Sequence, residues 1–355
     1  MYTPARALLR GLVAFGLFIL SPGCVGYVVA SGYFQAELLL SRRPATDVLA
    51  EGRLSVGEHQ RLALVPALKA YGLSLGLSAT DNYDTLAVGW HRSIYNVSAC
   101  EPLSFTSRTW GFPIVGRVPY LGFFRPEDAE RRAARLTEGG YEVWVRTAGA
   151  YSTLGWFRDP VLPGMLRWSE ADLAETVFHE LAHATLWIRG SVAFNESFAS
   201  FVGDVAATRY LEDTYGAESA EVRAFTESNA DHRRWQLLLH DLYEDLDKVY
   251  RDPALDDGAR TQKKAELYLS LPRRIGDSDL VRKARYQRVA TAEPWNNARL
   301  AQHRTYNTAQ DHFADVYALS GDLPRFIADV RQVVKGARQP FDALRRRAET
   351  AVQIP

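Results

Sequence analysis

Residues 177–188 read VFHELAHATLWI, an HExxH sequence inside a run that is otherwise almost wholly apolar. Ser169 followed by Asp172 resembles a helix-capping box, and Gly190 is typical of a residue that ends a helix. We therefore expect one helix from about Glu170 to Arg189, with an apolar stripe that packs against the protein core.

Two histidines and a glutamate interrupt the apolar face of this helix. His179 and His183 are one turn apart and face the same side, which is the spacing that two imidazoles need to bind one metal ion. Burying them beside Glu180 without partners costs roughly several kcal/mol, so their polar groups must be satisfied. A metal ion does this directly, whereas the alternative is a chance match whose histidines hydrogen-bond within the core. The pattern favours the metal site.

A third ligand is expected a short distance downstream. Glu196 opens a second apolar helix that should end near Tyr215, just before Gly216. Only twelve residues separate His183 from Glu196, so the chain must turn near Gly190 and return antiparallel. Two imidazoles and a carboxylate favour one zinc ion with its fourth position open to water, the gluzincin arrangement. The alternative for Glu196 is a first-turn acid that the helix dipole favours.

The rest of the chain predicts an α+β, mainly α-helical fold. Residues 33–77 resemble a helical hairpin, and residues 85–147 contain short β-branched and aromatic runs typical of a small sheet. Pro126 to Glu138 should form one helix packed between those strands. No repeat or long linker divides the chain, so we expect a single zincin-like domain over residues 25–355. Its parts are a helical and β part (25–168) and a helical part with the HExxH motif (169–355).

The first 24 residues have the form of an export signal. Arg6 and Arg10 precede an apolar run from Gly11 to Leu20, and Cys24 follows small and turn-forming residues, as at a bacterial lipoprotein signal. The alternative is an uncleaved anchor helix from Gly11 to Ala30. Either interpretation tethers the protein to a membrane with its bulk on the extracytoplasmic or periplasmic side.

Composition excludes one class of partner and leaves others open. Lys plus Arg and Asp plus Glu are both 42, so the formal charge is zero and no basic field exists to bind nucleic acid. With 47% hydrophobic residues, the chain should fold as an ordinary globular protein. The sequence does not indicate an oligomeric state.

Several blocks together resemble one known family. They are HELAH at 179–183, FNESFASFV at 194–202, the block from Ala150 to Phe157, and Asn296-Asn297-Ala298 ahead of Thr305-Tyr306-Asn307. In these blocks the chain is similar to the family of predicted bacterial zinc aminopeptidases, many of which carry lipoprotein-like signals. The resemblance covers nearly the whole mature chain. It implies an HExxH metallopeptidase with a peptide substrate.

The expected roles follow from the chemistry of such sites. Glu180, beside the metal but not ligating it, would act as the general base that accepts the proton of the attacking water. Tyr306 and Tyr151 are candidates for stabilising the developing oxyanion, because both lie in blocks shared with the family; the alternative for each is a packed aromatic ring. His303 and His312 are weaker candidates.

A hydrogen-bond partner for one of the ligating histidines is also expected. Thermolysin-like gluzincins carry an aspartate one turn after the ligand glutamate, and Ser200 stands at that place here. Asn195 or Asp204 could supply the missing hydrogen bond.

The predicted reaction is hydrolysis of a peptide bond, with aminopeptidase activity favoured. The alternatives are a metal-dependent endopeptidase, an amidase acting on non-peptide bonds, and a membrane-tethered scaffold whose zinc is structural. Glu180 counts against the scaffold, because a structural zinc site needs no general base. An aminopeptidase must also neutralise the free ammonium of its substrate, and the sequence does not reveal which carboxylate does so.

Overall fold

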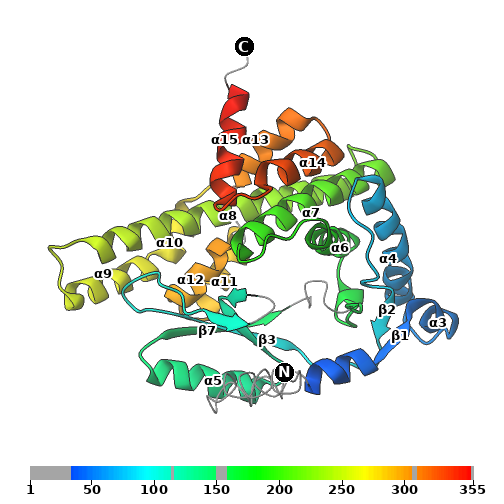
Figure 1. The fold of residues 1–355 in the computed structure, drawn as a ribbon. Coiled ribbons are helices and arrows are strands. Elements are labelled where there is room, and N and C mark those ends of the chain that lie inside the picture. Colours follow the sequence, from blue (N-terminus) through cyan, green and yellow to red (C-terminus); the bar gives the residue numbers. More distant parts are fainter. Residues whose placement is uncertain (1–32, 113–115, 149–157, 306–309, 353–355) are drawn as a thin grey trace, which may run out of the picture.

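The computed structural model describes residues 33–112, 116–148, 158–305 and 310–352 (Figure 1). Most of these residues are helical and the strands form small antiparallel sheets, so the predicted α+β, mainly helical class is confirmed. The segment 1–24, including Cys24, lies outside the described residues. Within the described part, no helix combines the length and the apolar character needed to cross a bilayer.

A three-stranded antiparallel sheet lies before the HExxH helix in the chain, as predicted. Its strands, in spatial order, are β6 (Tyr120–Phe123), β3 (Ile94–Cys100) and β7 (Glu142–Ala148). The pairing places Val97 of the central strand opposite both Leu121 and Val145. Helix α5 (Pro126–Glu138) covers one face and buries Leu136 in a small core with Val97. The predicted helix between the strands is therefore confirmed at its predicted bounds.

The predicted helical hairpin at residues 33–77 is only partly correct. Residues 33–40 are helical, but the chain then extends into a short strand before helices α3 (Ala45–Ala50) and α4 (Val56–Ser74). The additional strands form two ribbons: β1 (Arg42–Pro44) with β2 (Thr85–Ala87), and β4 (Trp110–Phe112) with β5 (Gly116–Val118). The extended conformation at residues 42–44 is stabilised by pairing with a strand more than 40 residues away. Such a distant partner cannot be predicted from local helix propensity.

The largest core surrounds the HExxH helix. The helices that contribute to it are α3 (Ala45–Ala50), α4 (Val56–Ser74), α6 (Glu170–Thr185), α7 (Val192–Tyr215), the start of α8 (Ala220–Arg251), α13 (Gln310–Ser320), α14 (Leu323–Val334) and α15 (Pro340–Val352), with a 3₁₀ turn at Met165–Arg167. Phe178 and Leu181 on α6 and Phe198 on α7 are buried in this core. The apolar stripe predicted for the HExxH helix thus packs against the interior. The polar residues of the motif, His179, Glu180 and His183, are not part of this core.

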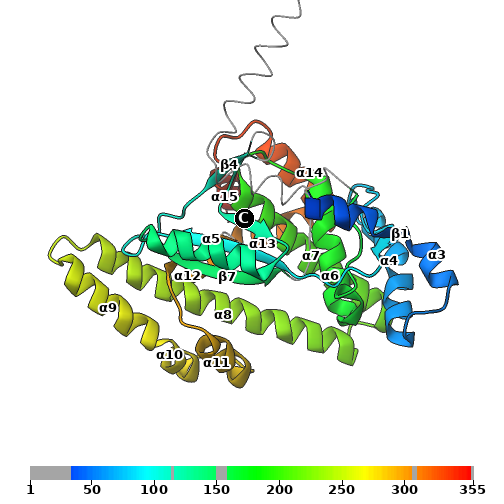
Figure 2. The same ribbon diagram turned by 90° about the horizontal axis from the view of Figure 1, so that it is seen from below.

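A second core lies along the long helix α8. It is built by α8 (Ala220–Arg251), α9 (Asp257–Leu269), α10 (Leu271–Asp277), α11 (Lys283–Ala292) and α12 (Asn297–Thr305). Helices α9, α10 and α11 run beside α8 (Figure 2). The side chain of Asn297, which is fully buried, donates to the carbonyls of Glu101, Pro102 and Ser104. These bonds fix the start of α12 against the loop that follows β3.

Candidate metal centre

The HExxH helix starts as predicted and ends earlier than predicted. The hydroxyl of Ser169 caps α6 by accepting from the backbone N–H of Asp172 at 3.1 Å. The helix ends at Thr185 instead of Arg189, because Leu186 is extended with φ −144° and ψ 118°. The Thr185 carbonyl instead accepts from Nε of Arg331 on α14 at 3.2 Å. A tertiary partner thus replaces the helical bond, which the local sequence does not reveal.

Three predicted ligands meet at the facing sides of α6 and α7. The Nε2 atoms of His179 and His183 are 3.1 Å apart, and the Glu196 Oε2 atom lies 3.6 Å from each of them. Within the described ranges, these residues form the one group of three or more His, Cys, Asp or Glu side chains suited to hold a metal ion. His183 and Glu196 are buried, and His179 is partly buried.

The spacing of these atoms fits a tetrahedral metal. Two ligand atoms about 2.0–2.1 Å from one zinc ion, separated by a tetrahedral angle, lie about 3.3–3.4 Å from each other. The three observed separations bracket that value. Two imidazoles and one carboxylate also leave a fourth position that no described His, Cys, Asp or Glu supplies. The donor set therefore fits a metal ion of the zinc type with an open position.

A glycine on α7 lets the two helices approach this closely. A Cβ atom at Gly203 would lie 3.0 Å from the Glu175 carbonyl oxygen and 3.3 Å from the His179 Cβ atom. Gly203 follows Glu196 by seven residues, almost two helical turns, so both lie on the face of α7 that meets α6. As α7 advances from Glu196 to Gly203, its contacts on α6 move back from His183 towards Glu175. The predicted antiparallel return is confirmed.

Asn195 fixes the turn between the two helices. Its Nδ2 donates to the Ile188 carbonyl at 2.9 Å, and its Oδ1 accepts from the Ile188 N–H at 2.8 Å. The suggestion that Asn195 bonds a ligating histidine is therefore wrong, because both ends of its amide are used by Ile188. The residue acts on the site indirectly: it closes the link so that Glu196 returns beside His183.

The electrostatics of the triad favour a cation. Burial alone would raise the pKa of Glu196, but its contacts with His179 and His183 outweigh burial and hold that pKa well below its usual range. Burial lowers the pKa of His179, whereas the contact with Glu196 and the charge of Glu180 raise it to a net value above the ordinary one. Positive charge at this point is therefore stabilised, as a metal ion requires.

Two buried polar groups complete the surroundings of the triad. Glu180, next to His179 on α6, is 8% exposed. The Nδ1 atom of His183 is buried and has no hydrogen-bond partner among the described residues. Metal-ligating imidazoles usually donate from their second nitrogen, which fixes the ring. His183 is instead held by packing, since it is 8% exposed and its ring meets that of Trp187 edge to face.

Tyr83 is a residue near the site that sequence reasoning missed. It is 2% exposed, its hydroxyl has no hydrogen-bond partner within the described part of the chain, and its φ is +67°. Burial first, and then the charges of Glu180 and Asp159, raise its pKa well above the usual value. No sequence signal identifies a tyrosine in the left-handed region, which non-glycine residues seldom occupy.

The remaining predicted site residues have mixed outcomes. Tyr151 and Tyr306 lie outside the described residues, so their predicted roles stay predictions. Asp204, the other suggested partner of a ligating histidine, instead accepts a hydrogen bond at its Oδ1 from Asn229 Nδ2 at 3.1 Å. His303 stacks against Trp144, and burial lowers its pKa to about 3.

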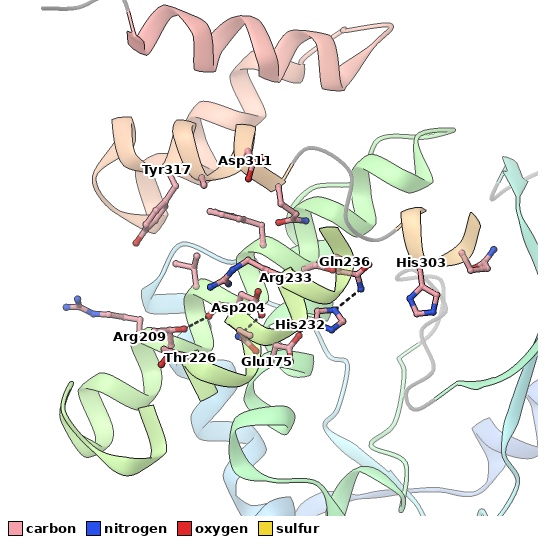
Figure 3. A pocket seen from close by; sticks show the side chains of 18 of the residues that line it. Glu175, Asp204, Arg209, Thr226, His232, Arg233, Gln236, His303, Asp311 and Tyr317 are labelled. Atoms are coloured by element: carbon pink, nitrogen blue, oxygen red, sulfur yellow. Dashed lines mark hydrogen bonds between the residues drawn. The ribbon is translucent and has the colours of Figure 1, made fainter. Parts of the chain in front are cut away.

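A cavity of about 870 Å³ lies one helical turn from the triad, and none of the three candidate ligands lines it. Its walls come from α7, α8, α12, α13 and β7, and Glu175 of α6 reaches it one turn before His179 (Figure 3). Ser200, one turn after Glu196, also lines it. A space of this volume is within the usual range for a small-ligand site. Sequence reasoning did not single out Glu175, although its i−4 spacing from His179 placed it on the metal-facing stripe.

Comparison with known proteins gives one match. Searches of curated proteins and of solved structures found no match to the chain. A scan against family models matched residues 26–343 to the family described as "Putative aminopeptidase". The matched range contains all three candidate ligands, Glu180 and the cavity residues, and it spans most of the 355 residues. The chain therefore belongs to this aminopeptidase family, and its candidate centre lies within the part that the family shares.

Proposed function

We propose that the protein is a zinc-dependent aminopeptidase with His179, His183 and Glu196 as the metal ligands. The observation that carries this proposal is the convergence of two imidazoles and one carboxylate to within 3.1–3.6 Å on helices α6 and α7. The family match supports peptidase chemistry. The zinc assignment is supported by the donor set, because zinc prefers this mixture of nitrogen and oxygen ligands in a tetrahedral site.

In this proposal, the protein side chains divide the work around the scissile bond. A zinc ion bound there supplies Lewis-acid activation of water and of the substrate carbonyl. Glu180, which follows His179 on the same helix, accepts a proton from the attacking water and passes it to the leaving amine. His179, His183 and Glu196 would hold that ion, and the contacts of Glu196 with the two imidazoles outweigh its burial and keep its pKa low, so its carboxylate is ionised.

Membrane attachment is a separate part of the proposal. The pattern of residues 1–24, with two arginines, an apolar run and Cys24, supports export and lipidation at Cys24. A lipid at that point would hold the catalytic part on the extracytoplasmic side of a membrane, where peptide fragments are its substrates. An uncleaved helix from Gly11 to Ala30 would give the same placement.

The test measures metal content and peptide hydrolysis side by side on the full chain. Wild type and Glu180→Gln are compared on peptides with free and with acetylated N-termini. We expect near-stoichiometric zinc in both proteins, with cleavage only in wild type, because glutamine keeps the size of residue 180 but cannot accept the proton. Preference for free N-termini would support the exopeptidase assignment over an endopeptidase.

The control is Glu170→Gln, which changes an acid at the start of the same helix, where Glu170 accepts from the Tyr210 hydroxyl, distant from the triad. This variant should keep both zinc and activity. Zinc without turnover on any peptide would move the assignment to a non-peptide amidase or a zinc-binding scaffold. A chain that binds no metal would overturn the proposal.

A further inference from the structure

The two helices that hold the candidate metal ligands also carry a pair of acidic residues, Glu175 and Asp204. On α6, Glu175, His179 and His183 follow at intervals of four residues, and on α7 the same interval relates Glu196, Ser200 and Asp204. Because the helices are antiparallel and His183 lies beside Glu196, Ser200 comes level with His179 and Asp204 with Glu175. Glu175 and Asp204 thus lie one helical turn beyond the level of His179, on the side away from His183.

Glu175 and Asp204 both face the cavity of about 870 Å³ (Figure 3). In the described ranges, the Glu175 carboxylate has no hydrogen bond or ion pair, and the charge that favours its ionised form is that of His179. Asp204 accepts from Asn229, and the charge of Arg233 acts on it. Burial and then the charge of Asp204 raise the pKa of Glu175 to about 7, and burial raises the pKa of Asp204 to about 6. Glu175 and Asp204 are therefore partly buried in the cavity wall, and the nearby positive charge does not offset the cost of ionising both carboxylates.

A second observation, independent of these acids, also indicates a missing donor. Gln302 on α12 lines the same cavity and is 4% exposed. Its Oε1 atom is buried and has no hydrogen-bond partner within the described part of the protein. A buried amide oxygen without a donor is destabilising, so such an atom is usually satisfied when the natural ligand is present. The cavity is therefore lined by two carboxylates and by a glutamine whose amide oxygen lacks a donor.

The arginines in the cavity wall do not remove this excess of acceptors. Arg209 pairs with Asp213 at 3.3 Å, and Arg146 has a partner of its own. Arg233 acts on Asp204 but is not among the groups that shift Glu175. A ligand that donates hydrogen bonds and carries positive charge would satisfy Glu175 and Gln302 together.

We propose that this cavity receives the N-terminal residue of the peptide substrate, with Glu175 and Asp204 neutralising its free α-ammonium and Gln302 accepting a hydrogen bond. The inference rests on the proposed peptidase function and names the feature that makes the site an exopeptidase. The ammonium lies two bonds from the scissile carbonyl carbon, so it must bind near the metal ligands. Glu175, one turn from His179, meets this requirement.

Calorimetry on the full chain tests the proposal without turnover. The zinc-loaded Glu180→Gln protein is titrated with leucinamide and with N-acetylleucinamide, which lacks the ammonium. A zinc ion alone can favour a free amine, so the deciding quantity is the change in selectivity when Glu175→Gln or Asp204→Asn is added. A hydrogen bond between charged groups predicts a loss of about 10- to 100-fold in the preference for leucinamide.

The matched control is Glu170→Gln, an acid five residues before Glu175 on α6 that does not line the cavity. We expect it to keep the selectivity of the parent. Unchanged selectivity in both Glu175→Gln and Asp204→Asn, or an equal loss in Glu170→Gln, would overturn the assignment. Circular dichroism and zinc content of each variant exclude loss of the fold as the cause.

Failure of the inference and failure of the proposed function give different results. If wild type hydrolyses free and acetylated peptides equally, the peptidase assignment stands and the ammonium site is wrong. If no peptide is hydrolysed but leucinamide selectivity depends on Glu175, the ammonium site stands and the peptidase assignment is wrong.

Discussion

Gly203 offers the sharpest test of how the fold builds the metal centre. Replacing it with alanine would place a Cβ atom 3.0 Å from the Glu175 carbonyl oxygen and 3.3 Å and 3.4 Å from the Cβ and backbone nitrogen of His179. Two of these three atoms are backbone atoms of α6, so relief requires the helices to separate by a few tenths of an ångström. Glu196, two turns earlier on α7, would then move away from the imidazoles.

The size of the effect follows from two opposing contributions. Overpacking in a well-packed core costs about 1–3 kcal/mol, whereas alanine in place of glycine inside a helix gains about 1 kcal/mol. The net loss of folding free energy for Gly203→Ala should therefore be about 0–2 kcal/mol. Zinc affinity should fall more visibly, by about 10- to 100-fold, which is typical when the supports of metal ligands are disturbed.

The assay is competition for zinc against a chelating dye, together with denaturant unfolding of the metal-free chain. The matched control is Gly57→Ala on α4, where an added Cβ atom meets nothing within 4 Å. That variant should keep its zinc affinity and be unchanged or slightly more stable. If Gly203→Ala binds zinc as tightly as wild type does, the close approach at Gly203 does not position the ligands, and the reasoning is refuted.

Three further outcomes follow from the same geometry. Asn195→Ala leaves the Ile188 N–H and carbonyl without their partners, so it should lower the free energy of unfolding by about 1–3 kcal/mol. A loss below about 0.5 kcal/mol, which is the error of denaturant unfolding, would contradict the role of these two hydrogen bonds in stabilising the turn. In the metal-free chain, the raised pKa of Glu175 stabilises the fold at low pH. That stability should decline between about pH 4.5 and 7, where the unfolded state loses this proton first, and the decline should be shallower in Glu175→Gln. Chelation of the metal should lower the thermal midpoint, with zinc restoring it in wild type but not in His183→Ala.

The convergence of His179, His183 and Glu196 could be predicted from the sequence because it depends on local geometry. The i, i+4 spacing of His179 and His183 and the short link to Glu196 leave the chain few ways to fold. The same periodicity also placed Glu175 and Asp204 on the facing stripes. Their shared cavity was not predictable, because α8, α12 and α13 complete it from positions far along the chain.

Other features depend on long-range partners that no local pattern reports. The HExxH helix ends at Thr185 because Arg331, 146 residues away, bonds its carbonyl. The strand at Arg42–Pro44 exists because it pairs with Thr85–Ala87. Asn195 looked like a partner for a histidine, yet its amide closes the turn at Ile188. In each case a tertiary contact outweighs the propensity of the local sequence.

The most direct test of the metal centre is zinc X-ray absorption on the full chain, in parallel with zinc content for wild type and Glu196→Gln. We predict about one zinc per chain with nitrogen and oxygen ligands at about 2.0–2.1 Å and no sulfur. We also predict much weaker retention of zinc in Glu196→Gln. Absence of tightly bound zinc in wild type, or full retention in Glu196→Gln, would contradict the assignment of His179, His183 and Glu196 as the ligands.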